Sequence, residues 1–348
     1  MPSSTPANHS GMKSNHSGVK SGNIRESGPE NKFRHARDSL LATLPELTIG
    51  EIPHWGPRSA EGLLSTVVSQ ERPFPCTFAV AAARKRTLRF GFVDGAGDRG
   101  DWAALPDLLR RYLEGYQALG KDTSFVVFFR PEPDGAALPL DGFRQRFWDV
   151  LGYLADKDSS PWPAELPTDP DDPLWEFTFG GVPIFVVCNT PAHGERRSRH
   201  AADFMITFQP RWVFEGLEAD SPRGAAARRT IRARLRAYDT VPPSPALGSY
   251  GDTDNREWRQ YFLPDADDGP PQAWERCPFL SARTLPGPTA RAPRRPDTPD
   301  HQAVRNDAGR FSVWPSGRRP PAGWSAVGPP GTRAQCLARA AELWGEQR

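Results

Sequence analysis

The spacing of apolar side chains divides the sequence into a structured middle and two different flanks. Between residues 33 and 263, apolar residues recur at every second position, in short runs, or at helical spacing. The alternation and the short runs predict strands over Leu88–Val93, Ser124–Phe129, Trp175–Phe179, Ile184–Asn189 and Phe204–Gln209. The helical spacing predicts helices over Leu40–Leu47, Ala60–Val68, Thr77–Ala83, Trp102–Leu119, Leu140–Leu154 and residues 224–238.

The order of these elements indicates the fold class. Gly180 and Gly181 separate two of the predicted strands, and such a pair is typical of a hairpin turn. Helices are interspersed among the strands, but no strand–helix–strand unit is repeated along the chain. We therefore expect an α+β fold, in which helices pack on a mixed, largely antiparallel sheet of about five strands.

Both flanks differ from the middle in composition. Residues 1–32 are polar, rich in Gly and Ser, and contain a near-duplicate heptad over 8–14 and 15–21. The histidines of this repeat could bind a metal, but the composition favours a disordered tail. Residues 264–348 are rich in Pro and Arg and are predicted to be mostly disordered, with a short helix within Thr332–Glu346. We therefore expect one catalytic domain over residues 33–263.

Charge and cysteine usage narrow the class of protein. The 44 Lys and Arg residues nearly balance 42 Asp and Glu, so the net charge of +2 provides no global field for nucleic acid or an anionic membrane. No apolar run approaches the roughly 18 residues of a membrane helix, and the amino end has no signal-peptide pattern. The four cysteines lack CxxC spacing and are read as reduced thiols. These features predict a soluble, cytoplasmic protein.

Cys76 is the first candidate for chemistry. It stands at the start of a predicted helix, directly after Pro73 and Pro75. The helix dipole and the free N–H groups at such a position favour a thiolate. A thiolate between Phe74 and Phe78 would suit a heme iron. The alternative is that Cys76 is a small buried core residue.

A second candidate is the basic loop that follows the fourth predicted strand. His193, Arg196, Arg197, Arg199 and His200 lie close together there. They could cradle an anion or a cofactor through charge-assisted hydrogen bonds, or form a solvated loop. Cys188 and His193 could bind a metal, but zinc would need a second ligand pair that is missing.

Three further sequence features have two readings each. Arg211 lies in an aromatic segment that could be a pocket wall or a structural corner, and Glu176, on a predicted strand, could bind a cationic substrate or face solvent. The arginines of helix 224–238 suggest nucleic acid, but its apolar stripe favours a solvated basic face. No nucleotide-binding, hydrolase-elbow, metalloprotease or kinase signature occurs.

The sequence resembles the YqcI/YcgG family through long, ordered segments over about residues 60–263. The matching segments are Phe74–Phe78, Leu88–Phe92, Phe125–Phe129, Phe147–Trp148, Ser160–Pro163, Asp169–Asp171, Trp175–Phe177, Phe185–His193, Arg196–Arg199, Ile206–Glu215 and Tyr250–Asp252. The resemblance implies a heme b enzyme that hydroxylates a nitrogen of guanidino compounds in natural-product pathways. Its substrates there include arginine, giving N-hydroxyarginine, and a cyclic guanidine in guanitoxin assembly.

The resemblance also implies roles for individual residues. It makes Cys76 the preferred iron ligand, with His193 or His200 as the alternative. The heme would lie between the helix that begins at Cys76 and the end of the sheet that carries residues 189–200. Thiolate ligation would favour cleavage of the O–O bond of dioxygen or hydrogen peroxide, and a reductase could supply electrons.

The remaining candidates are assigned to the substrate and to the heme propionates. Arg196, Arg199 and Arg211 are expected to anchor propionates or a substrate carboxylate. Glu176 or Asp203 would hold the guanidinium, and His193 would relay a proton. Two other hypotheses remain open: a non-catalytic heme carrier or sensor, and a metal-binding or interaction protein without heme that docks through its proline-rich tail.

Overall fold

The computed structural model describes most of the chain. It covers residues 41–131, 138–217, 221–266 and 277–279, and residues 301–345 except 308, 310, 317–319, 321 and 322. The tail predicted over residues 1–32 lies outside these ranges. The chain divides into two units, Met1–Arg283 and Thr284–Arg348, and each is described here by itself.

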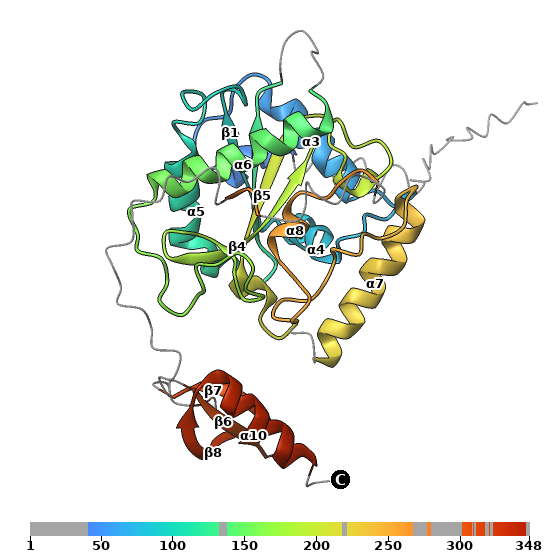
Figure 1. Ribbon diagram of the computed structural model, residues 1–348. Helices are drawn as coiled ribbons and strands as arrows, with labels where there is room; N and C mark the ends of the chain where they lie inside the picture. Colours follow the sequence, from blue (N-terminus) through green and yellow to red (C-terminus); the bar gives the residue numbers. More distant parts are fainter. Residues whose placement is uncertain are drawn as a thin grey trace, which may run out of the picture. The chain divides into compact units, whose positions relative to one another are not determined.

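A five-stranded sheet forms the centre of the first unit (Figure 1). Its strands lie in the order β1-β2-β5-β4-β3, with bounds Leu88–Val93 (β1), Ser124–Phe129 (β2), Phe177–Phe179 (β3), Val182–Asn189 (β4) and Met205–Pro210 (β5). β1 and β2 are parallel, and the other neighbouring pairs are antiparallel. The predicted α+β fold with a mixed, largely antiparallel sheet is confirmed.

The predicted hairpin joins β3 to β4. Gly180 and Gly181 have φ angles of +60° and +73°, and Phe179 pairs with Val182 across this two-residue turn. Two successive residues with positive φ are required by the turn type that best fits the twist of a tight hairpin. Glycine adopts this conformation without a steric penalty, which explains the pair in the sequence.

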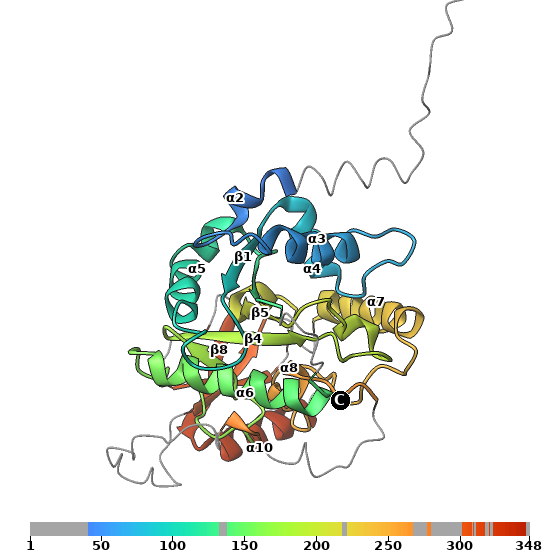
Figure 2. The same cartoon turned by 90° about the horizontal axis from the view of Figure 1, so that it is seen from above.

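Helices cover both faces of the sheet (Figures 1 and 2). Their bounds are Leu44–Leu47 (α2), Gly56–Val67 (α3), Thr77–Lys85 (α4), Leu105–Leu119 (α5), Leu140–Lys157 (α6), Pro222–Tyr238 (α7) and Trp258–Tyr261 (α8), with 3₁₀ turns at Arg197–Arg199 (η1) and Arg211–Phe214 (η2). α5 and α6 pack against one face, whereas α3 and α4 lie over the other. No described helix combines the length and apolarity that a membrane crossing requires.

Side-chain alternation gives the two faces of the sheet different properties. One face packs into the large core with α5 and α6; it is formed by Phe125, Val127, Phe129, Ile184, Val186, Cys188, Ile206 and Phe208. The intervening residues of the same strands turn to the opposite face, because successive side chains of a strand point to opposite sides. Several of these are polar or only partly buried, so the second face is not filled in the same way.

The first unit continues beyond the boundary predicted at residue 263. The ring of Phe279 lies 5.6 Å from that of Trp175 and 5.8 Å from that of Phe177, and Cys277 is buried. Asp265 accepts hydrogen bonds from backbone N–H groups of residues 194–196. The predicted boundary is therefore too early, because these long-range contacts cannot be recognised from local composition.

The second unit corrects the prediction that residues 264–348 are mostly disordered. Strands His301–Asn306 (β6), Phe311–Pro315 (β7) and Trp324–Gly331 (β8) form an antiparallel sheet in the order β7-β6-β8. Helix Arg333–Gly345 (α10) packs on it, which confirms the short helix predicted there. Pro329 and Pro330 lie in β8, an edge strand, where proline is tolerated. A high proline content was therefore not a sufficient basis for predicting disorder in this part of the chain.

Replacing Gly91 in β1 with alanine is expected to destabilise the first unit. A Cβ atom at this position would lie 2.6 Å from Cζ of Phe125, whose ring is fully buried and stacked on Tyr112. Such overpacking lowers the free energy of unfolding by about 1–3 kcal/mol, so the midpoint of urea unfolding should fall.

Gly62→Ala is the matched control. A Cβ at Gly62 in α3 would meet no atom within 4 Å, and the residue is exposed. Alanine there should stabilise the helix by about 0.5–1 kcal/mol. Equal urea midpoints for the two variants would contradict the packing described for β1.

Candidate functional site

A cavity of about 550 Å³ lies in the first unit, over the less filled face of the sheet. The strands contribute Ser124, Val126, Phe185, Val187, Asn189, Met205, Thr207 and Gln209, which are the residues that alternate with the core-facing set. α3, α4 and α7 contribute Leu63, Val67, Phe78, Ala79, Ala227, Ile231 and Leu235. The walls are therefore largely apolar, with polar groups concentrated near the strand ends and α8. This is the usual composition of a small-molecule pocket.

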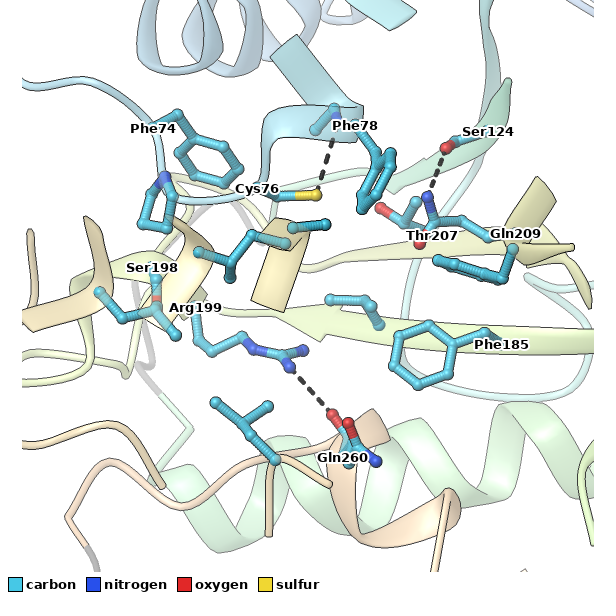
Figure 3. A pocket seen from close by; sticks show the side chains of 18 of the residues that line it. Phe74, Cys76, Phe78, Ser124, Phe185, Ser198, Arg199, Thr207, Gln209 and Gln260 are labelled. Carbon is cyan, nitrogen blue, oxygen red and sulfur yellow. Dashed lines mark hydrogen bonds between the residues drawn. The ribbon is translucent and has the colours of Figure 1, made fainter. Parts of the chain in front are cut away.

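Cys76 lies in the wall of this cavity (Figure 3). It is the N-cap residue of α4, and its Sγ accepts a hydrogen bond from the backbone N–H of Ala79 at 3.4 Å. Phe74 and Phe78 flank it; their rings make edge contacts with Tyr238 at 5.8 Å and with Phe214 at 6.3 Å. These contacts hold the thiol in a fixed, apolar setting, as the sequence predicted.

The protonation state of Cys76 differs from the prediction. Burial raises the pKa of its thiol, and the N–H groups of Ala79 and Phe78 and the nearby Arg199 and Arg234 only partly oppose this effect. The backbone N–H groups at the helix start do lower this pKa, as expected, but desolvation outweighs them, so the expected thiolate is not favoured here. The free protein therefore carries a neutral thiol at this position, which a bound metal ion would deprotonate.

Arg199 and Arg196 reach the cavity from the loop after β4. Arg199 is almost fully buried and donates from Nη2 to the carbonyl oxygen of Gln260 at 3.0 Å (Figure 3). Burial lowers the pKa of Arg199 to about 10, so it stays cationic at neutral pH. Arg196 donates from Nε to Pro264 O at 2.7 Å and from Nη1 to Pro242 O at 3.1 Å. Of the two, Arg199 is the better placed to meet an anionic group.

Glu176 and Arg211 form a buried ion pair at the polar end of the cavity. Arg211 donates from Nε to Glu176 Oε2 at 2.8 Å and from Nη2 to Glu176 Oε1. Glu176 is fully buried, which rules out the solvent-facing reading, and Arg211 engages both of its oxygens. A substrate guanidinium at Glu176 or a propionate at Arg211 would have to compete with this pairing, and the two predicted roles stay predictions.

The other predicted polar residues lie outside the cavity lining. His193 is buried, with Nδ1 2.9 Å from Thr190 Oγ1 and Nε2 3.0 Å from Leu263 O. His200 is exposed, with Nδ1 2.9 Å from the carbonyl oxygen of His193. Asp203 accepts a hydrogen bond from Ser59 Oγ at 2.6 Å. The structure therefore does not bring His193, His200 or Asp203 into the cavity lining, and their predicted roles as iron ligand, proton relay and guanidinium-binding group stay predictions.

Several arginines of helix α7 form hydrogen bonds within the protein and do not only face solvent. Its apolar stripe lines the cavity as predicted, but three of its arginines fasten neighbouring loops through backbone carbonyls. Arg228 donates to Leu217 O, Arg232 to Leu247 O and Arg234 to Phe74 O. The last of these bonds holds the segment that precedes Cys76. The prediction of a purely solvated basic face is therefore incomplete.

Glu257 and Tyr250 line the cavity, and neither was assigned a role from the sequence, although Tyr250 begins one of the matching segments, Tyr250–Asp252. Glu257 is the N-cap residue of α8, is only 4% exposed, and has its Oε1 3.4 Å from Arg211 Nη2. The Tyr250 ring lies under the Arg211 guanidinium, at 3.8 Å from ring centroid to Cζ. The signal that could have found Glu257 is its position directly before Trp258–Phe262, a segment with three aromatic residues that indicates burial.

Comparison with known proteins gives two family matches. Residues 64–280 match the YqcI/YcgG family, and residues 291–348 match the family of the MbtH-like protein. The second match spans the segment that contains β6, β7, β8 and α10. No solved structure matches this chain significantly.

Three relatives illustrate the first match. YcgG of Bacillus subtilis (strain 168) is 39% identical over 236 residues, which cover 68% of this chain and 92% of YcgG. YqcI of the same organism is 39% identical over 235 residues, covering 67% and 91%. The Streptomyces lavendulae protein named "Putative N(omega)-hydroxy-L-arginine synthase DcsA" is 34% identical over 213 residues, covering 59% of this chain and 77% of that protein.

The buried His193 is expected to make the first unit sensitive to acid. Burial lowers the pKa of His193 from 6.5 to about 4, so the folded state stays unprotonated where the unfolded state binds a proton. Stability should therefore fall as pH decreases from about 6.5 to about 4, by up to about 3 kcal/mol. The measurement is the free energy of unfolding in urea at several pH values.

His193→Gln should flatten this pH dependence, whereas the same change at the exposed His54 should leave it as in the wild type. The comparison between variants is needed because Glu257 titrates in an overlapping range. An unchanged slope in His193→Gln would show that the imidazole is not held neutral by burial.

Proposed function

This chain belongs to the YqcI/YcgG family, and from that premise we propose that it is a heme-dependent N-hydroxylase. Its substrate would carry a guanidino or amino nitrogen, with arginine or a related guanidine of specialised metabolism as the class. The observation that carries the proposal is the position of Cys76. Among the described residues it is the one Cys or His side chain that lines the cavity, and the walls around it are apolar.

The donor set of the cavity suits a porphyrin iron better than a bare metal ion. A porphyrin supplies four nitrogen ligands, so one axial protein ligand is sufficient. Zinc sites need three or four protein ligands, and within the described residues no group of three or more His, Cys, Asp or Glu side chains is placed to hold a metal. Cys188 lies on the core-facing side of β4 and does not line the cavity. Cys76 is therefore the residue that would hold the iron.

Arg199 is the residue that would pair with a heme propionate. Its guanidinium lies in the cavity, and its two described hydrogen bonds go to neutral carbonyl oxygens. It therefore keeps donors and its positive charge for an anion, whereas Arg211 is neutralised by Glu176. A charge-assisted pair in a buried setting is stronger than one in water. Arg196, which the carbonyls of Pro242 and Pro264 fix in place, adds positive potential to the same side.

The proposed reaction replaces an N–H bond of the substrate with N–OH. With hydrogen peroxide as oxidant, one oxygen atom enters the product and the other leaves as water. With dioxygen, formation of that water also takes two electrons and two protons from a reductant. The bound heme would supply the O–O bond cleavage. The protein would position the nitrogen, and its apolar walls would exclude bulk water.

Cys76→Ala is expected to remove the spectral signature of thiolate ligation. The purified wild-type protein, expressed with ample heme supply, should show a heme Soret band that shifts to the thiolate type when the protein is reduced and exposed to carbon monoxide. The variant should lose this shift, because no other thiol among the described residues lines the cavity, and the thioether of Met205 cannot become a thiolate.

Cys188→Ala provides the matched control, since this thiol is buried on the opposite face of the sheet. It should keep the wild-type spectrum. A thiolate-type spectrum that survives in Cys76→Ala would refute the ligand assignment. A wild-type protein that contains no iron and does not take up hemin would refute the heme-dependent function itself.

A further inference from the structure

The cluster of Glu176, Arg211, Tyr250 and Glu257 contains a guanidinium site that the protein fills with its own arginine. Arg211 makes a two-point ion pair with Glu176, and its plane lies over the Tyr250 ring. Two-point pairing with a carboxylate and stacking on an aromatic ring are the contacts that distinguish a guanidinium from a compact ammonium group. The surroundings at this end of the cavity are thus already suited to guanidinium groups.

The charges of this cluster do not balance. Arg211 contributes one positive charge, whereas Glu176 and Glu257 carry two negative charges when ionised. Glu176 and Arg211 neutralise each other, and Glu257 approaches the same guanidinium only through Oε1, at 3.4 Å. Oε2 of Glu257 is buried and has no hydrogen-bond partner among the described residues. An ionised carboxylate that is desolvated and half-paired is costly, so the cluster lacks one cation.

Glu257 lines the cavity that contains Cys76. We propose that Glu257 binds the cationic guanidinium of the substrate, with its free Oε2 accepting N–H hydrogen bonds beside the Arg211–Glu176 pair. This inference rests on the proposed function, because it assigns the substrate-recognition residue of the same cavity. Glu257 would thus bind the substrate guanidinium, a role expected from the sequence for Glu176. A bound guanidinium would complete the charge balance and satisfy the orphaned oxygen.

The titration of Glu257 is consistent with this role. Burial raises the pKa of Glu257 to about 7. The negative charge of Glu176 also raises this pKa, whereas the positive charge of Arg211 lowers it. The charged or titratable groups around it are Arg211, Glu176, Tyr250 and Tyr261, and burial raises the pKa of Tyr261 so that it stays neutral. Arg211 stays cationic, because the two glutamates raise its pKa although burial alone would lower it. Burial raises the pKa of Tyr250, which stays neutral. A guanidinium would displace the proton of Glu257 on binding.

The test is guanidinium binding by the purified full-length protein, measured by isothermal titration calorimetry with L-arginine, agmatine and methylguanidine as probes. L-Citrulline, in which a neutral ureido group replaces the guanidinium, serves as the ligand control. The wild type should bind at least one guanidinium probe and discriminate against citrulline. Glu257→Gln should weaken that binding by about 10- to 100-fold, since it removes a charge-assisted pair.

Two variants separate recognition from folding. Glu257→Asp keeps the carboxylate and should retain part of the affinity. Glu114→Gln should bind as the wild type does, because Glu114 is exposed on α5, which packs against the opposite face of the sheet and does not line the cavity. Wild-type affinity should increase as pH rises through about 7, and Glu257→Gln should lose this dependence.

Three results would overturn the inference: no probe binds to the wild type, citrulline binds as tightly as the guanidinium probes, or Glu257→Gln binds unchanged. The hydroxylase proposal fails by a different route. If the guanidinium binds through Glu257 but no N-hydroxylated product forms in heme-loaded protein, the recognition residue stands and the activity does not. If product forms while Glu257→Gln keeps wild-type affinity, the activity stands and the assignment of Glu257 fails.

Discussion

The strict alternation of side chains along β2, β4 and β5 is the constraint on which the rest of the first unit depends. One set of residues, including Phe125, Val186 and Phe208, is buried against α5 and α6 and supplies the main core. The other set, including Ser124, Thr207 and Gln209, lines a cavity. Because the two sets share the same backbones, the tight packing of one face fixes the positions of the groups on the other. A rigid sheet therefore carries a cavity whose walls are preorganised.

Burial decides which polar groups in and around that cavity are available for chemistry. It keeps the Cys76 thiol neutral, holds His193 unprotonated outside the lining, and joins Glu176 to Arg211 in a closed pair. Two charged groups remain available to a ligand. Arg199 is hydrogen-bonded only to neutral carbonyls among the described contacts, and Glu257 has one oxygen without a partner among the described residues. Among the described residues that line the cavity, Cys76 thus provides a soft metal ligand, Arg199 a cation and Glu257 a carboxylate. These are complementary to a heme with its propionates and to a cationic guanidine.

Local periodicity was sufficient to predict the five strands, the hairpin and the position of Cys76 at the start of α4, because each is set by neighbouring residues. The partners of Glu176, Arg211 and His193 could not be predicted in this way. Glu176 and Arg211 are 35 positions apart, and His193 contacts Leu263 at a separation of 70. Composition also gave no indication of strands β6, β7 and β8. A proline-rich sequence is typical of disordered tails, but proline is also tolerated on an edge strand such as β8. Whether an acidic residue is paired through both oxygens, as Glu176 is, or through one, as Glu257 is, depends on the assembled cavity.

The central proposal is that oxygen is transferred to a guanidino nitrogen in the cavity that Cys76 lines. Mass spectrometry of the products formed by the heme-loaded full-length protein tests this claim most directly. The guanidine would be one that the protein binds, and the oxidant would be isotopically labelled hydrogen peroxide, or labelled dioxygen with a reductant. The account predicts a product that has gained one labelled oxygen atom on a guanidino nitrogen. Unchanged guanidine after the oxidant has been consumed, or a labelled oxygen on carbon alone, would contradict it.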